Sequence, residues 1–223
     1  MSRDRVMQNV RRALGRSVAA PQQAPLPPPP PRIDESIVRL VHSVLGLDEL
    51  FVRMARENQM AVEQVSTGDL AERLFASLRS HACRSVALSA GGVLEKLRLA
   101  TALRSAGFVA KVWDEMTPDE LYDVDAGVTG VRFAIAETGS LVIEGSRAHG
   151  RALSLVPPVH IAVVEAKSLL PDLVDLFEHL ARDAQAANTV IITGPSKTAD
   201  IEMNLVTGVH GPGAVQVFLL QPA

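Results

Sequence analysis

Short apolar runs alternate with amphipathic helical patterns along most of this chain, and that alternation constrains the fold most strongly. Each short apolar run is the right length for one buried strand, and the stretches between them carry apolar residues at helical spacing. Strands separated by helices pair in parallel, because the helix returns the chain to the same end of the sheet. The pattern predicts an α/β protein with an open, mostly parallel sheet and helices on both faces.

The expected elements can be placed along the chain. Strands are expected at 60–65, 84–89, 109–113, 131–136, 141–144, 160–164, 189–192 and 214–220. Helices are expected at 33–58 with a break at Gly46, and at 67–79, 91–103, 171–184 and 198–205. In the helix at 171–184, Leu173, Leu176, Phe177 and Leu180 are expected to face inward. Gly139 allows the positive φ of a hairpin turn between 131–136 and 141–144.

The first 32 residues have a different character. Val6, Val10 and Leu14 form one apolar stripe of a short helix that Ser2 can cap and Gly15 can end. A proline-rich stretch follows, and prolines favour an extended backbone. We therefore expect an N-terminal amphipathic helix (1–16), a linker (17–32) and one α/β domain (33–223). The helix can dock on its own domain, on a partner, or on a second copy, which would give a homo-oligomer.

Charge and cysteine content exclude several classes of protein. The formal net charge is −3, which is unlike the basic field of a nucleic-acid-binding protein. The one cysteine, Cys83, cannot supply the four thiolates of an iron–sulfur cluster, and its flanks predict a buried structural thiol. No metal site is expected. The N-terminus has no signal-peptide pattern and no apolar run could span a membrane, so we expect a cytoplasmic protein.

Glycines and polar residues cluster in segments that border predicted strands, and these are the candidate binding segments. Ligands of open α/β sheets gather at the carboxyl ends of strands, and glycine lets the backbone approach them. The loop after strand 189–192 is the most informative of them, because it enters the helix expected at 198–205, whose free amides and Lys197 could hold a carboxylate or phosphate. It lacks the glycine that a Walker A loop has before its lysine. The candidate ligand-binding residues are Gly130, Thr138, Gly139, Gly194, Ser196, Lys197, Thr198 and Asp200.

Two residues are candidates for catalysis. Glu137 lies in the hairpin turn, where a partly desolvated carboxylate could act as base or nucleophile. His210 lies beside a further glycine cluster and could carry a proton near neutral pH. Both also fit a structural interpretation, since a hairpin tip and a surface loop are ordinary places for a solvated Glu and His.

Three stretches resemble a known family. Asp125–Ile143, Ser154–Ile161 and Ile192–Glu202 are similar to the LUD domain, and the N-terminal helix and linker resemble its short LutC/YkgG members. The resemblance implies a fold similar to the NagB/RpiA/CoA-transferase group. It also implies a role in oxidising L-lactate to pyruvate beside iron–sulfur subunits, with clusters on those partners and no cofactor on this chain.

Two other functions remain open from the sequence. The chain could be a regulatory module that binds a small carboxylate. It could also be a stand-alone enzyme, because Glu137-Thr-Gly is similar to the Glu-x-Gly turn of CoA-transferases, in which the Glu attacks an acyl-CoA.

Overall fold

A computed structural model describes residues 3–15, 46–117, 119–145, 150–182, 188–199, 205–207 and 210–221, without the side chains of 198–199 and 205–207. The chain divides into two compact units, residues 1–38 and 39–223. In the first unit, helix α1 (Arg3–Ala13) carries the predicted stripe, and Val6 and Val10 are exposed. The helix ends at Ala13, and Gly15, the predicted stop, follows it with a φ of +64°. The predicted linker and Ser2 lie outside the described residues.

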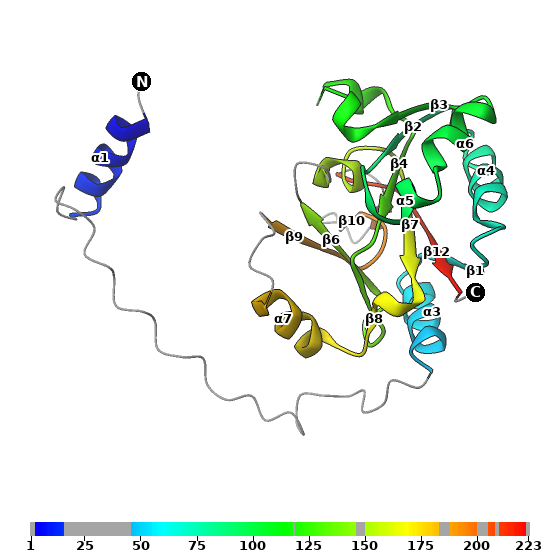
Figure 1. The fold of residues 1–223 in the computed structure, drawn as a ribbon. Helices are drawn as coiled ribbons and strands as arrows, with labels where there is room; N and C mark the ends of the chain where they lie inside the picture. Colours follow the sequence, from blue (N-terminus) through cyan, green and yellow to red (C-terminus); the bar gives the residue numbers. More distant parts are fainter. Residues whose placement is uncertain are drawn as a thin grey trace. The chain divides into compact units, whose positions relative to one another are not determined.

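The second unit is built on a six-stranded parallel sheet (Figure 1). Its order is β1-β12-β7-β4-β2-β3, and all five neighbouring pairs are parallel. The strands are β1 (Ala61–Val65), β2 (Ser85–Leu88), β3 (Val109–Val112), β4 (Ala126–Gly130), β7 (Val159–Glu165) and β12 (Ala214–Leu220). The predicted open, mostly parallel sheet is confirmed.

Helices cover both faces of this sheet. On one face, α4 (Leu70–Ser80), α5 (Gly92–Lys96) and α6 (Leu99–Ser105) bury leucines against β2, β4 and β7. On the other face, α3 (Leu47–Glu57) packs Phe51 and Ala55 against β1, β7 and β12. The 3-10 helices η1 (Trp113–Glu115), η2 (Asp119–Asp123) and η3 (Arg151–Ser154) frame this second face, where Leu121 and Leu153 pack against Ala87 of β2.

A smaller, four-stranded sheet joins the second face. Its order is β8-β5-β6-β9, formed by β5 (Phe133–Ile135), β6 (Ser140–Gly145), β8 (Leu169–Leu170, after η4, Ala166–Ser168) and β9 (Asn188–Ile192). β5 and β6 form the predicted antiparallel hairpin, and β9 pairs with β6. Helix α7 (Leu173–Arg182) buries Leu176 on this sheet. Figure 1 shows β6, β9 and α7 on the side away from α4 and α6.

Several predictions are wrong in detail. The helix expected at 198–205 is contradicted where the structure describes it, because Lys197–Ala199 (β10) and Leu205–Thr207 (β11) form an antiparallel pair. The helix expected at 91–103 is interrupted at Arg98, whose φ is +52°. Phe177, expected to face inward, is 61% exposed. The expected helical segment before Gly46 lies outside the described residues, whereas Cys83 is buried as predicted.

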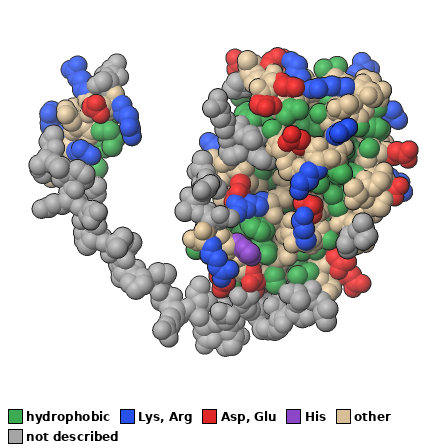
Figure 2. Space-filling model, in the orientation of Figure 1, with side chains coloured by type: hydrophobic (Ala, Val, Ile, Leu, Met, Phe, Trp, Pro, Cys, Tyr) green, Lys and Arg blue, Asp and Glu red, His purple; other side chains and the backbone are tan. Residues whose placement is uncertain are grey.

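Charged side chains of both signs are interspersed over the face of the molecule in Figure 2. Within the described ranges, no helix combines the length and apolar character that crossing a membrane requires. In the same part of the chain, no group of three or more His, Cys, Asp or Glu side chains is placed to hold a metal ion.

Candidate functional site

At the carboxyl edge of the parallel sheet, two neighbouring strands send the chain to opposite faces. β2 continues into α5 and α6 on one face, whereas β4 continues into β5 on the other. Ligands of open α/β sheets bind in the crevice at such a point. Ser89, directly after β2, accepts a hydrogen bond from the backbone N–H of Gly130 at 3.2 Å. Of the predicted ligand-binding residues, Gly130 therefore lies at the position that this rule favours.

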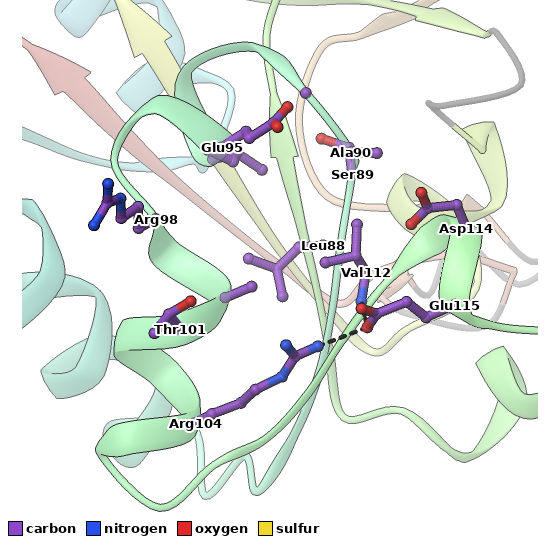
Figure 3. A pocket seen from close by; sticks show the side chains of 13 residues that line it. Leu88, Ser89, Ala90, Glu95, Arg98, Thr101, Arg104, Val112, Asp114 and Glu115 are labelled. Atoms are coloured by element: carbon purple, nitrogen blue, oxygen red, sulfur yellow. Dashed lines mark hydrogen bonds and ion pairs between the residues drawn. The ribbon is translucent and has the colours of Figure 1, made fainter.

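A cavity of about 360 Å³ lies beside this point, between the carboxyl ends of β2 and β3 and the helices that connect them (Figure 3). Its volume falls within the range of about 300–1,000 Å³ that is typical of small-molecule sites. Ala90, Ala100 and Val112 contribute apolar surface, whereas Leu88 and Leu94 line the cavity but are almost fully buried. Ser89 and Thr101 contribute hydroxyl groups. The charged lining residues are Glu95, Arg98, Arg104, Asp114 and Glu115.

One ion pair in this cavity is held in place by the backbone. Arg104 Nη2 lies 2.6 Å from Glu115 Oε2, and Arg104 Nε donates a hydrogen bond to the carbonyl oxygen of Ala110 at 2.8 Å (Figure 3). The backbone N–H of Val112 donates to the same Glu115 oxygen at 3.0 Å. This backbone hydrogen bond, reinforced by the charge of Arg104, lowers the pKa of Glu115. The Glu115 carboxylate is therefore kept charged, and its Oε2 is already paired with Arg104 and the Val112 N–H.

The other three charged side chains of the cavity are Glu95, Arg98 and Asp114. They make no side-chain hydrogen bond or ion pair with any residue that the structure describes. In Figure 3, Glu95 extends from α5 beside Ala90, and Asp114 lies on the opposite side of the cavity, beyond Val112. These groups are available to a ligand.

The predicted turn at Glu137–Ser140 lies elsewhere, against the end of α3. Asn58 Nδ2 donates to the carbonyl oxygen of Thr138 at 2.8 Å. The hydroxyl of Ser140 lies 2.8 Å from those of both Thr138 and Thr193. Gly194 approaches Asn58 as well. The structure thus brings together Thr138, Gly139 and Gly194, which sequence analysis placed in two separate segments.

Glu137 itself is half-buried, and its environment raises the pKa of its carboxyl group. Burial is the larger cause, and the charge of Asp172 adds to it. Asp172 is buried and caps α7. Its Oδ1 accepts a hydrogen bond from the backbone N–H of Val174 at 2.8 Å and from that of Asp175 at 3.1 Å. A raised pKa suits a proton acceptor. Glu137 does not line the 360 Å³ cavity, however.

Glu137→Gln is expected to raise the free energy of unfolding at pH 7. The folded state holds a carboxylate beside Asp172 that the unfolded state solvates freely, so the charged form is disfavoured by folding. The pKa of Glu137 is higher in the folded state than in the unfolded state, so the carboxylate becomes protonated in the folded protein as the pH falls through this value. The destabilisation of wild type by the charged carboxylate then disappears, and with it the extra stability of Glu137→Gln. Urea denaturation at pH 7 and pH 4 measures both effects. Glu57→Gln, at the exposed end of α3, is the control, and a variant less stable than wild type at pH 7 would contradict the prediction.

A second group of predicted residues lies at the amino edge of the parallel sheet. Ser196 N–H donates to the carbonyl oxygen of Pro212 at 2.9 Å, and Gly213 N–H donates to that of Pro158 at 2.9 Å. The glycine loop that contains Gly211 and Gly213 precedes β12, so the expectation that it lies at the carboxyl end of a parallel strand is wrong. The loop from 194 follows β9, which belongs to the smaller sheet.

The remaining predicted residues of this group are exposed or undescribed. His210 is exposed in the loop before β12, and Lys197 is exposed at the start of β10. Thr198 lies in β10 rather than at a helix start, and its side chain and Asp200 lie outside the described part. The helix-terminus site that motivated Lys197, Thr198 and Asp200 is therefore not formed by residues 197–199.

A buried histidine on the second face was not singled out by sequence analysis. His160 of β7 is fully buried, and its Nε2 lies 2.8 Å from Thr129 Oγ1 of β4. Its Nδ1 has no hydrogen-bond partner among the described atoms. Burial lowers the pKa of His160 to about 4, so the ring is neutral at physiological pH.

Sequence analysis also missed the residues that line the carboxyl-edge cavity. One signal could have identified them: the strand at 85–88 runs into Gly91-Gly92 and a helix, and the next strand ends directly before Asp114 and Glu115. Adjacent parallel strands bring these two ends together. The fold and this edge define an open α/β protein with a cavity at the carboxyl ends of β2 and β3 and a smaller sheet on its second face.

Comparison with known proteins identifies the family. The LUD domain matches residues 49–220, so the chain belongs to the LUD domain family. The uncharacterized protein YkgG of Escherichia coli (strain K12) is 29% identical over 95% of this chain and 94% of its own length. Lactate utilization protein C of Halalkalibacterium halodurans is 35% identical over 46% of this chain and 48% of that protein. That of Bacillus subtilis (strain 168) is 39% identical over 40% of this chain and 39% of that protein.

The matched segments thus span half or less of those two lactate utilization proteins. Among solved structures, a DUF162 family protein from Deinococcus radiodurans is similar, with a TM-score of 0.60 and 24% identity. The similarity covers 78% of this chain and 96% of that one. At this level of identity the match supports the fold alone.

Proposed function

We propose that this chain is a non-redox subunit of an iron–sulfur-dependent complex that oxidises L-lactate to pyruvate. The observation that carries the proposal is membership of the LUD domain family together with the relatives named lactate utilization protein C. The chain's own chemistry fits a subunit that passes no electrons. Its one cysteine is buried, and burial raises the pKa of the Cys83 thiol, which disfavours the thiolate that binds a cluster. Partner subunits would therefore carry the clusters.

Deletion of the gene is expected to abolish growth on L-lactate as sole carbon source and to leave growth on pyruvate intact. The second substrate separates a defect in oxidation from one in later metabolism. Wild type and Glu57→Gln should restore growth, and Glu137→Gln reports whether the Glu137 carboxylate is needed. Normal growth of the deletion strain on L-lactate, in cells without another lactate oxidase, would overturn the proposal and favour a regulatory module or a stand-alone enzyme.

Assembly is tested separately. A tagged full-length chain purified from cells grown on L-lactate is expected to bring with it iron, acid-labile sulfide and lactate-oxidising activity. The same chain purified from cells that lack the other subunits should be free of iron. Iron bound to the isolated chain would contradict the assignment of the clusters to the partners.

A further inference from the structure

The proposed lactate role assigns nothing to the carboxyl-edge cavity. It lies in one β-α-β unit: β2, the turn at Gly91-Gly92, the helices α5 and α6, and β3. Both glycines have positive φ, +77° and +59°. In nucleotide-binding β-α-β units, an acidic residue about 20 residues after the glycine turn, at the end of the second strand, binds the ribose hydroxyls. Asp114 occupies the corresponding position after β3.

We propose that this cavity binds a ribonucleoside, with Asp114 accepting hydrogen bonds from the ribose cis-diol and the apolar floor holding the base. Asp114 is the acceptor left over at this strand end, because its neighbour Glu115 is occupied by Arg104 and the Val112 N–H. Val112, Ala90 and Ala100 line the cavity and are partly exposed, so they provide the apolar surface against which a planar base can pack.

The charges of the cavity favour a ligand with hydroxyl donors over an anion. Two carboxylates of the cavity, Glu95 and Asp114, lack partners among the described residues, whereas only one basic side chain of the cavity, Arg98, lacks one. A phosphate beside both carboxylates would be repelled, whereas neutral hydroxyl groups can donate to them. Helix α5 also has only five residues before the backbone turns at Leu97 and Arg98, so it provides no extended helix dipole for a phosphate. The ligand is therefore assigned as a nucleoside rather than a nucleotide.

The chain contains its own reporter of binding. Trp113 is the only tryptophan, and it directly precedes Asp114 in η1. Titration of the full-length protein with adenosine is expected to change Trp113 fluorescence in a saturable way. 2′,3′-Dideoxyadenosine, which lacks the diol, should bind at least about tenfold more weakly, the loss expected for hydrogen bonds to a charged group. Ribose alone should bind far more weakly than adenosine, because it lacks the base.

The matched variants are Asp114→Asn and Asp119→Asn. Asp114→Asn is expected to weaken adenosine binding roughly ten- to a hundredfold and to leave dideoxyadenosine binding unchanged. Asp119→Asn, an exposed acid of η2 that does not line the cavity, should change neither. Calorimetry provides a second readout that does not depend on the tryptophan.

The proposal would be overturned if neither method detected saturable adenosine binding at millimolar concentrations. It would also be overturned if wild type bound adenosine no more tightly than dideoxyadenosine or ribose. An Asp114→Asn variant that binds both nucleosides as wild type does would contradict it as well. The comparison of nucleosides on wild type stays decisive even where the variant folds poorly. Because no lactate or partner enters these assays, their outcome is independent of the proposed lactate role.

Discussion

Replacing Gly139 by alanine is expected to lower the free energy of unfolding by about 2–5 kcal/mol. Gly139 has a φ of +62°, which costs an alanine about 1–2 kcal/mol. A Cβ at this position would also lie 2.7 Å from Ala55 Cα and 2.5 Å from the carbonyl carbon of Met54. Both are backbone atoms of α3, so the hairpin turn must move away from the helix, and such overpacking typically costs about 1–3 kcal/mol.

Gly46→Ala separates the two causes. Its φ of +71° is similar, but a Cβ there would meet no described atom within 4 Å. This control should therefore show the backbone cost alone, about 1–2 kcal/mol. Urea denaturation of both variants measures the difference, which is the cost of separating the turn from α3. Equal losses in the two variants would show that the contact between the turn and α3 is looser than the structure indicates.

The same contact shows what sequence analysis could and could not predict. The hairpin was predicted because Gly139 separates two apolar runs, and the glycine and the runs are local signals in the sequence. Its packing against Met54, Ala55 and Asn58 is not local, because 80 residues separate Asn58 from Thr138, whose carbonyl oxygen accepts the hydrogen bond of the Asn58 side-chain amide. Nothing in the pattern of either segment selects the other. The close approach explains why a glycine stands there, yet glycine alone does not reveal its neighbour.

Strand β4 was missed for a related reason. Gly127 and Gly130 weaken a strand pattern, so no strand was expected between 109–113 and 131–136. In the structure, β4 is central, and a Cβ on Gly127 would lie 2.9 Å from the carbonyl carbon of Leu153 in η3. The glycine is there because another backbone packs closely on the strand, which is a tertiary cause that the local sequence does not show.

The carboxyl edge of the sheet could be expected from the sequence as the place for a ligand. The glycine loop before β12, however, lies at the opposite edge. Strand direction depends on which strands pair, and β9 joins the smaller sheet instead of the parallel one. The acids and arginines of the cavity come from helices and a 3-10 helix whose spacing resembles that of any solvated surface, so only the fold distinguishes Asp114 from Asp119.

His160 is expected to make the protein sensitive to acid. The folded pKa, about 4, is lower than the ordinary value of 6.5, so the unfolded state binds a proton first as the pH falls. The free energy of unfolding is therefore unaffected by this residue well above pH 6.5 and decreases between pH 6.5 and 4. At pH 4.5 the loss from His160 amounts to about 2.5 kcal/mol, from about 1.4 kcal/mol per pH unit.

His160→Gln removes this titration and keeps a polar group that can hydrogen-bond to Thr129. We expect the variant to be less stable than wild type at pH 7, because the amide fills less of the buried space. Between pH 7 and 4.5, however, it should lose about 2.5 kcal/mol less than wild type does. His81→Gln, at an exposed position after α4, should keep the wild-type pH dependence. Parallel pH profiles of wild type and His160→Gln in urea denaturation would mean that His160 takes up a proton in the folded state, and that water or a rearranged neighbour reaches its Nδ1.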